Sequence, residues 1–170
     1  MAEEIVNRVK KSRTQLLDLE DIYPDGERVI FDIAPYLWEG IALKEKDFRE
    51  AVDKIDPENF RGKYVAVTCR VDATIPTWAY MLIASKLGNS AKLMVFGSEK
   101  ELENAIFEAL IHNIDFSKYT GERVIIKGCS KREVPVSAYV KLAAELSKYA
   151  KQIMYGEPCS TVPVFKKPRR

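Results

Sequence analysis

A self-similarity at a spacing of 59 residues is the feature that most constrains the fold of this 170-residue chain. Residues 43–97 align without a gap on residues 102–156, and 14 of the 55 aligned pairs are identical, among them Phe48/Phe107. A regular spacing of this length is typical of a duplicated supersecondary unit. The alternative is a single kind of α/β unit that occurs twice because both copies meet the same packing needs.

Each copy shows the order helix, strand, helix, strand. Apolar residues recur at helical spacing in the first helix of each copy, and short β-branched runs follow Gly62 and Gly121. Pro76 and Pro135 favour a helix start after the strand, because a first-turn residue needs no N–H donor. The predicted helices cover 43–55, 76–89, 102–114 and 135–149, and the predicted strands cover 63–69, 92–96, 122–128 and 152–155.

Alternating helices and strands predict an α/β fold with a mostly parallel sheet. We expect a single three-layer domain with about five strands, because neither copy could bury both faces of its own sheet. The expected divisions are 1–42 (an N-terminal helix over Glu3–Arg13, an edge segment and a first strand at 28–33), repeat one at 43–101, repeat two at 102–160 and a basic tail at 161–170.

Composition narrows the class of protein. Lys and Arg number 27 against 25 Asp and Glu, and this near balance argues against a dedicated nucleic-acid binder. No apolar run is long enough to span a bilayer, and the acidic start lacks the pattern of a signal peptide. We therefore expect a cytoplasmic protein without a membrane partner, in which three cysteines do not form a disulfide framework.

The repeat places the cysteines at comparable points of the fold. Cys69 aligns with Gly128 and Cys129 with Arg70, so two thiols follow equivalent strands and precede helices that start at proline. Cys159 comes just after the last predicted strand. Because ligands bind at the carboxyl edge of an open parallel sheet, the three thiols are expected at the functional edge.

Three convergent thiolates favour a soft cation, and the sequence predicts zinc or an iron–sulfur cluster held by Cys69, Cys129 and Cys159. Asp72 or Glu157 is a candidate for the fourth ligand, and an open fourth position is equally allowed. No phosphate-binding glycine motif and no Ser/His/Asp arrangement is visible, so whether the protein is an enzyme stays open.

Two alternatives stand beside the metal site. The protein could be a thiol-based sulfur-transfer or redox protein with Cys159 as the nucleophile. It could also be a non-enzymatic interaction module with incidental thiols, which would dock through the surface near Trp38 or through the C-terminal tail. Tyr80 and Tyr139 occupy aligned positions in their helices and are interpreted as core packing.

Several long strings are distinctive of one family. They are Glu4-Ile-Val-Asn-Arg-Val-Lys10, Asp18-Leu-Glu-Asp21, Lys44-Glu-Lys-Asp-Phe-Arg-Glu50, Pro76-Thr-Trp-Ala-Tyr-Met81, Lys127-Gly-Cys-Ser130, Val134-Pro-Val-Ser-Ala-Tyr139 and Tyr155-Gly-Glu-Pro-Cys-Ser-Thr-Val-Pro163. Over nearly its whole length the chain resembles the uncharacterised bacterial domain-of-unknown-function family 2480. The resemblance implies no assigned activity. It also implies genes near iron–sulfur assembly components, so it predicts iron–sulfur assembly proteins as partners and favours metal or sulfur chemistry.

Overall fold

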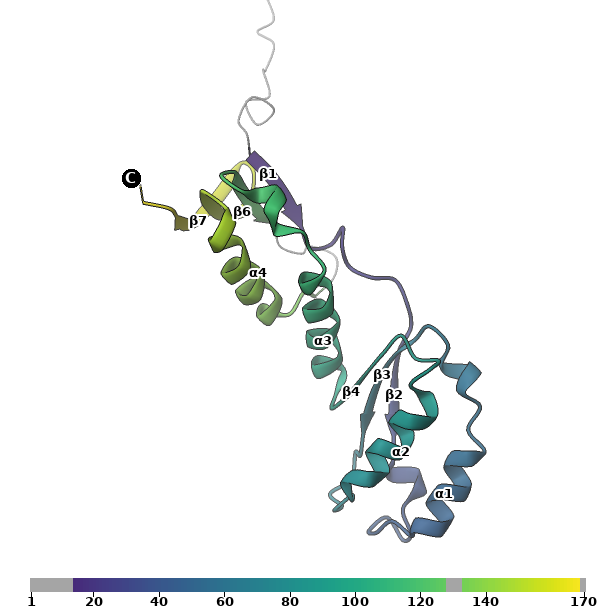
Figure 1. Ribbon diagram of the computed structural model, residues 1–170. Coiled ribbons are helices and arrows are strands. Elements are labelled where there is room, and N and C mark those ends of the chain that lie inside the picture. Colours follow the sequence, from purple (N-terminus) through teal and green to yellow (C-terminus); the bar gives the residue numbers. More distant parts are fainter. Residues whose placement is uncertain (1–13, 128–132, 169–170) are drawn as a thin grey trace, which may run out of the picture. The chain divides into compact units, whose positions relative to one another are not determined.

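The computed structural model describes residues 14–127 and 133–168, and it has the expected α/β character (Figure 1). Contacts between residues divide the chain into two compact units. Unit 1 has residues 1–23 and 107–170, and unit 2 has residues 24–106. The elements in chain order are β1 (Thr14–Asp18), β2 (Arg28–Asp32), η2 (Ala34–Tyr36), α1 (Glu45–Asp53), η3 (Pro57–Phe60), β3 (Tyr64–Thr68), α2 (Thr77–Leu87), β4 (Leu93–Phe96), α3 (Glu99–His112), η4 (Phe116–Tyr119), β5 (Arg123–Lys127), α4 (Val136–Tyr149), β6 (Gln152–Glu157) and β7 (Ser160–Lys166).

Unit 2 is built on sheet B, in which β2, β3 and β4 lie side by side in that order and run parallel. Helix α1 is amphipathic and α2 is apolar on most of its surface, and both pack apolar residues on this sheet. The buried core consists of Phe31, Ile33, Val65 and Val67 from the sheet region, Phe48 and Val52 from α1, and Ala79, Ile83 and Leu87 from α2.

Unit 1 is built on sheet A, with the strand order β1, β5, β6, β7. The first three strands are parallel, and β7 pairs antiparallel with β6 through a bulge at Ile153/Met154. The core joins side chains of α3 and α4 to the sheet: Phe107 and Ile111 from α3, Ala138, Leu142 and Leu146 from α4, and Leu17, Val124, Ile126 and Ile153 from the strands.

The two units repeat the same local chemistry at positions 59 residues apart. Asp56 and Asp115 each accept a hydrogen bond from the backbone N–H two residues on and so cap a short 3-10 helix. Gly62 and Gly121 follow with φ of 70° and 76°, a left-handed conformation that favours glycine. Turn geometry therefore explains why these aspartates and glycines are identical in the two copies. The duplication itself stays a prediction.

Two expectations change. The described strands form two sheets and not one sheet of five strands, because the lead-in supplies a first strand to each sheet, β1 to sheet A and β2 to sheet B. Most of the expected basic tail is strand β7. The expected helix at Glu3–Arg13 lies outside the described residues. No finding tests the three-layer arrangement or the domain boundaries.

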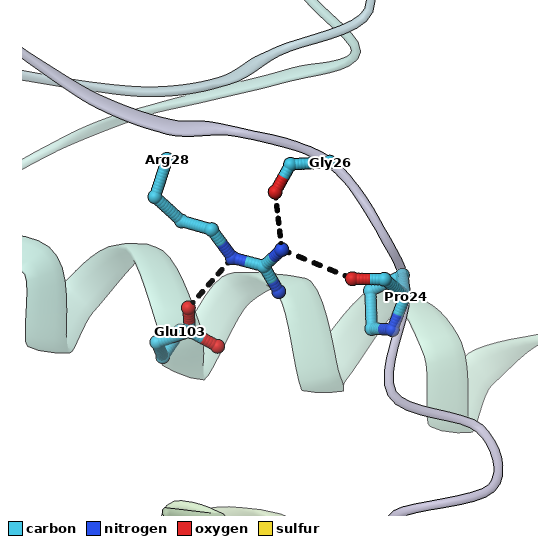
Figure 2. A network of polar contacts seen from close by, with 4 residues as sticks. All are labelled: Pro24, Gly26, Arg28 and Glu103. Atoms are coloured by element: carbon cyan, nitrogen blue, oxygen red, sulfur yellow. Dashed lines mark hydrogen bonds and ion pairs between the residues drawn. The ribbon is translucent and has the colours of Figure 1, made fainter. Parts of the chain in front are cut away.

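A polar network fixes the turn that leads into sheet B (Figure 2). The Arg28 guanidinium donates to the Pro24 and Gly26 carbonyl oxygens at 3.0 and 2.6 Å, and its Nε lies 2.9 Å from Oε1 of Glu103 on α3. The guanidinium also lies over the Tyr64 ring, 4.9 Å from the centroid. One side chain thus joins the turn, strand β3 and the first part of α3, which belongs to unit 2.

Candidate functional site

The carboxyl ends of β2 and β3 are tied together by the last residue of β2. Asp32 accepts hydrogen bonds through Oδ1 from the backbone N–H of Ala34, at 2.9 Å, and from that of Arg70, at 3.1 Å. The first bond starts the short η2 helix, and the second anchors the loop after β3. Asp32 therefore organises the carboxyl edge of sheet B, where ligands of parallel sheets bind.

Cys69 lies at this edge, directly after β3, as predicted. Its thiol is half-buried and donates to the carbonyl oxygen of Val71 at a sulfur–oxygen distance of 3.7 Å. Asp72, the predicted partner ligand, is exposed in the same loop. The thiol thus makes a local turn contact, and a described residue satisfies its donor.

An aromatic pair joins α2 to the end of β4. The Tyr80 and Phe96 rings meet edge to face with their centroids 5.0 Å apart. Phe96 is 68% exposed although it is a large apolar side chain. Burial raises the pKa of the Tyr80 phenol, and the negative charge of a Cys69 thiolate raises it further. Cys69 and Tyr80 also pack against the same core of unit 2, so the pair and the thiol share one neighbourhood.

This neighbourhood gives a first testable result. We expect Cys69→Ala to lower the pKa of Tyr80 only part of the way to its ordinary value, because burial, the larger cause, remains. The measurement is a titration of the Tyr80 ring signals by NMR. Since the raised pKa favours the neutral phenol in the folded state, its contribution to stability is present below the ordinary value near pH 10 and is lost as the pH rises. An unchanged Tyr80 titration in the variant would contradict the proximity of the two groups.

The carboxyl edge of sheet A carries a lysine between two carboxylates. Lys127 Nζ, at the end of β5, lies 3.1 Å from Oδ2 of Asp18 and 3.9 Å from Oε1 of Glu157. The hydrogen bond to Asp18 and the charges of both carboxylates raise the pKa of Lys127. Glu157, predicted as a metal ligand, faces a protein cation instead.

Sheet A has its own aromatic pair between α4 and β6. The Tyr139 and Tyr155 rings meet edge to face with centroids 5.6 Å apart. Each of these tyrosines is 59 positions after its counterpart in the Tyr80–Phe96 pair. Tyr155 is 43% exposed, and Val162 of β7 is its cross-strand partner. Both sheets thus present an aromatic ring near the end of a strand that follows a helix, β4 after α2 in sheet B and β6 after α4 in sheet A.

The predicted metal or iron–sulfur site is wrong. Within residues 14–127 and 133–168, no three His, Cys, Asp or Glu residues are grouped so that they could hold a metal ion. Cys69 follows a strand of sheet B, while the exposed Cys159 lies in the turn between β6 and β7 of sheet A. Cys129 lies outside the described residues. The two described thiols therefore do not share the edge of one sheet, as the prediction required.

Sequence reasoning missed the apolar surface at these edges. It interpreted Tyr80 and Tyr139 as core residues, whereas each lies at the border of a core and contacts an exposed ring. The available signal was the conservative match of Phe96 with Tyr155 at the same spacing. Trp38, the surface residue that was singled out, is exposed and lies under the Lys44 ammonium at 4.2 Å from the ring centroid.

Comparisons with known proteins assign no activity. The sequence profile of a family described as a protein of unknown function (DUF2480) matches residues 3–167, which confirms the resemblance. No curated protein and no solved structure shows a significant match. Among the described helices, none has both the length and the apolar character required to cross a membrane.

Proposed function

Because the chain belongs to the DUF2480 family, whose description assigns no activity, we propose its function from geometry: it is a protein-interaction module. The docking surface is the edge patch, which we define as the rings of Tyr80 and Phe96. It receives an apolar segment of a partner protein. The partner's identity and any link to iron–sulfur assembly are untested.

The observation that carries this proposal is the exposure of Phe96. An exposed phenylalanine leaves a large apolar area in water, and aromatic side chains dominate the binding energy of protein interfaces. Its ring is held by Tyr80, so little side-chain freedom remains to be lost when a partner binds.

A matching patch in unit 1 supports the same function. Tyr139 and Tyr155 form the counterpart pair. We propose that the two units arose by duplication of one α/β unit and that both kept an apolar edge. In this interpretation the thiols are incidental to docking, as in the interaction-module alternative of the sequence analysis.

The test compares tagged full-length variants in cells that carry the gene. We expect a partner that is recovered with the wild type to be depleted at least about tenfold with Phe96→Ser, because a central aromatic contact contributes more than 1 kcal/mol to binding. Ile41→Ser is the matched control, since Ile41 is 67% exposed in the same unit. The purified partner must then bind the purified wild type and discriminate between the two variants in the same way.

The same experiment separates docking from thiol chemistry. A chain with Cys69→Ala and Cys159→Ala is expected to retain the partner at the wild-type level. Equal recovery of every partner by wild type and Phe96→Ser, with both proteins folded, would overturn the proposal. Loss of the partner only in the cysteine variant would point to thiol chemistry instead.

A further inference from the structure

Strands β4 and β6 have the same place in their sheets but different outer neighbours. Each is the third parallel strand, and the pairs Tyr64↔Leu93 and Arg123↔Gln152 place the two ladders 59 positions apart. On its outer side β6 pairs with β7. β4 ends the strand order of sheet B, so among the described strands nothing pairs with its outer side.

The backbone of β4 is oriented to accept another strand. The Gly97 N–H, directly after β4, donates to the Val67 carbonyl of β3 at 3.0 Å. Because the N–H groups of successive strand residues point to alternate sides, those of Leu93 and Val95 also point to β3, and those of Met94 and Phe96 point away from it. Edge strands with free N–H groups are templates for strand addition unless charge or proline blocks them.

β4 lacks the usual protection of an edge. Leu93–Phe96 reads Leu-Met-Val-Phe, four apolar residues without charge or proline. By contrast, β7, which forms the edge of sheet A, contains Pro163 and ends at Lys166. The edge of sheet A formed by β7 is thus protected, whereas the edge of sheet B formed by β4 is open to pairing.

The pairing of β7 with β6 indicates what fits on β4. Val162 is the cross-strand partner of Tyr155, and Thr161 is that of Gly156. The corresponding residues of β4 are Phe96 and Gly97, 59 positions earlier. Phe96 is 68% exposed against 43% for Tyr155, as expected for a ring without a β-branched neighbour across the strand.

We infer that β4 binds an extended segment of a partner protein as an antiparallel strand, in the way that β6 binds β7. The segment carries a small residue opposite Gly97, a β-branched residue opposite Phe96 and a large apolar residue opposite Met94, where the β6 ladder has Phe165 opposite Ile153. Main-chain bonds to Met94 and Phe96 supply affinity, and the side chains of the segment supply specificity. The inference rests on the proposed docking function and names its binding mode.

The probe is a synthetic peptide with the sequence of residues 160–167, added to the isotope-labelled full chain. We expect amide hydrogen exchange at Met94 and Phe96 to slow about tenfold or more at saturating peptide, because new hydrogen bonds protect these groups. A scrambled peptide and the Ile41→Ser chain are the controls. Phe96→Ser is expected to weaken peptide binding about tenfold while leaving the unliganded fold intact.

Each outcome decides one proposal. Unchanged exchange at Met94 and Phe96 with millimolar peptide, or equal protection by the scrambled peptide, overturns strand addition. Protection that instead rises with protein concentration alone identifies a second copy as the occupant and also overturns the inference. If strand addition fails while Phe96→Ser still loses its cellular partner, the docking function stands with another binding mode.

Discussion

Replacing Phe48 by alanine is expected to lower the free energy of unfolding by about 3–5 kcal/mol, because the change removes apolar contacts and leaves a cavity. Phe48 is only 1% exposed. Its ring meets those of Tyr36 and Trp78 at centroid distances of 5.8 and 5.9 Å, so α1, α2 and the segment after β2 all lose contacts. For a domain of ordinary stability, a loss of this size removes a large share of the folding free energy.

Tryptophan fluorescence during urea unfolding measures this loss of stability and reports on unit 2, which contains Phe48. Both tryptophans, Trp38 and Trp78, belong to unit 2. Ile41→Ala is the control, because Ile41 is largely exposed and its truncation is expected to change stability by less than about 0.5 kcal/mol. A loss below about 1 kcal/mol for Phe48→Ala would contradict the packing of unit 2 described above.

Arg28→Met is expected to destabilise the protein by about 2–3 kcal/mol. Removing one partner of a buried ion pair costs about 3–5 kcal/mol, and the side chains of Arg28 and Glu103 are 20% and 22% exposed, which reduces that cost. The substitution leaves the Glu103 carboxylate without its cation. It also removes the donors to the Pro24 and Gly26 carbonyl oxygens seen in Figure 2.

A double-mutant cycle with Glu103→Met isolates the ion pair. We expect the double variant to lose less than the sum of the single losses, with a coupling of about 1 kcal/mol or more, because residues in one network are not additive. Glu103→Gln keeps the size of the side chain and a hydrogen-bonding oxygen, so it separates charge from packing. Strict additivity of the two methionine substitutions would show that the contact does not contribute to stability.

Local structure was predictable because its determinants are local. Periodic apolar residues specified the four longer helices, and Pro76 and Pro135 were rightly predicted near the start of α2 and α4, where they are the N-caps. The β-branched runs specified β3 and β5 in the same way. Strand β7 was missed because Pro163 and the neighbouring lysines suggest a frayed end, and only pairing with β6 makes that segment a strand.

The candidate site was harder to predict for a physical reason. The positions of Cys69 and Cys159 next to strand ends followed from the sequence, but their convergence depended on a single sheet. The exposed edge of β4 carried no motif at all. We recognise this edge by comparing β4 with its counterpart β6, which pairs with β7 on its outer side.

The sequence by itself determined the helices, most strands, the repeated turn chemistry at 59-residue spacing and the family, because these depend on residues close together in the chain or on the string itself. Only the tertiary structure decided that the lead-in gives a first strand to each of two sheets. The backbone of a strand can form hydrogen bonds with any strand that has a free edge. The partner of each strand is therefore decided by which apolar faces can be buried together. That choice put Cys69 and Cys159 after strands of different sheets and left β4 at the end of the strand order of sheet B among the described strands.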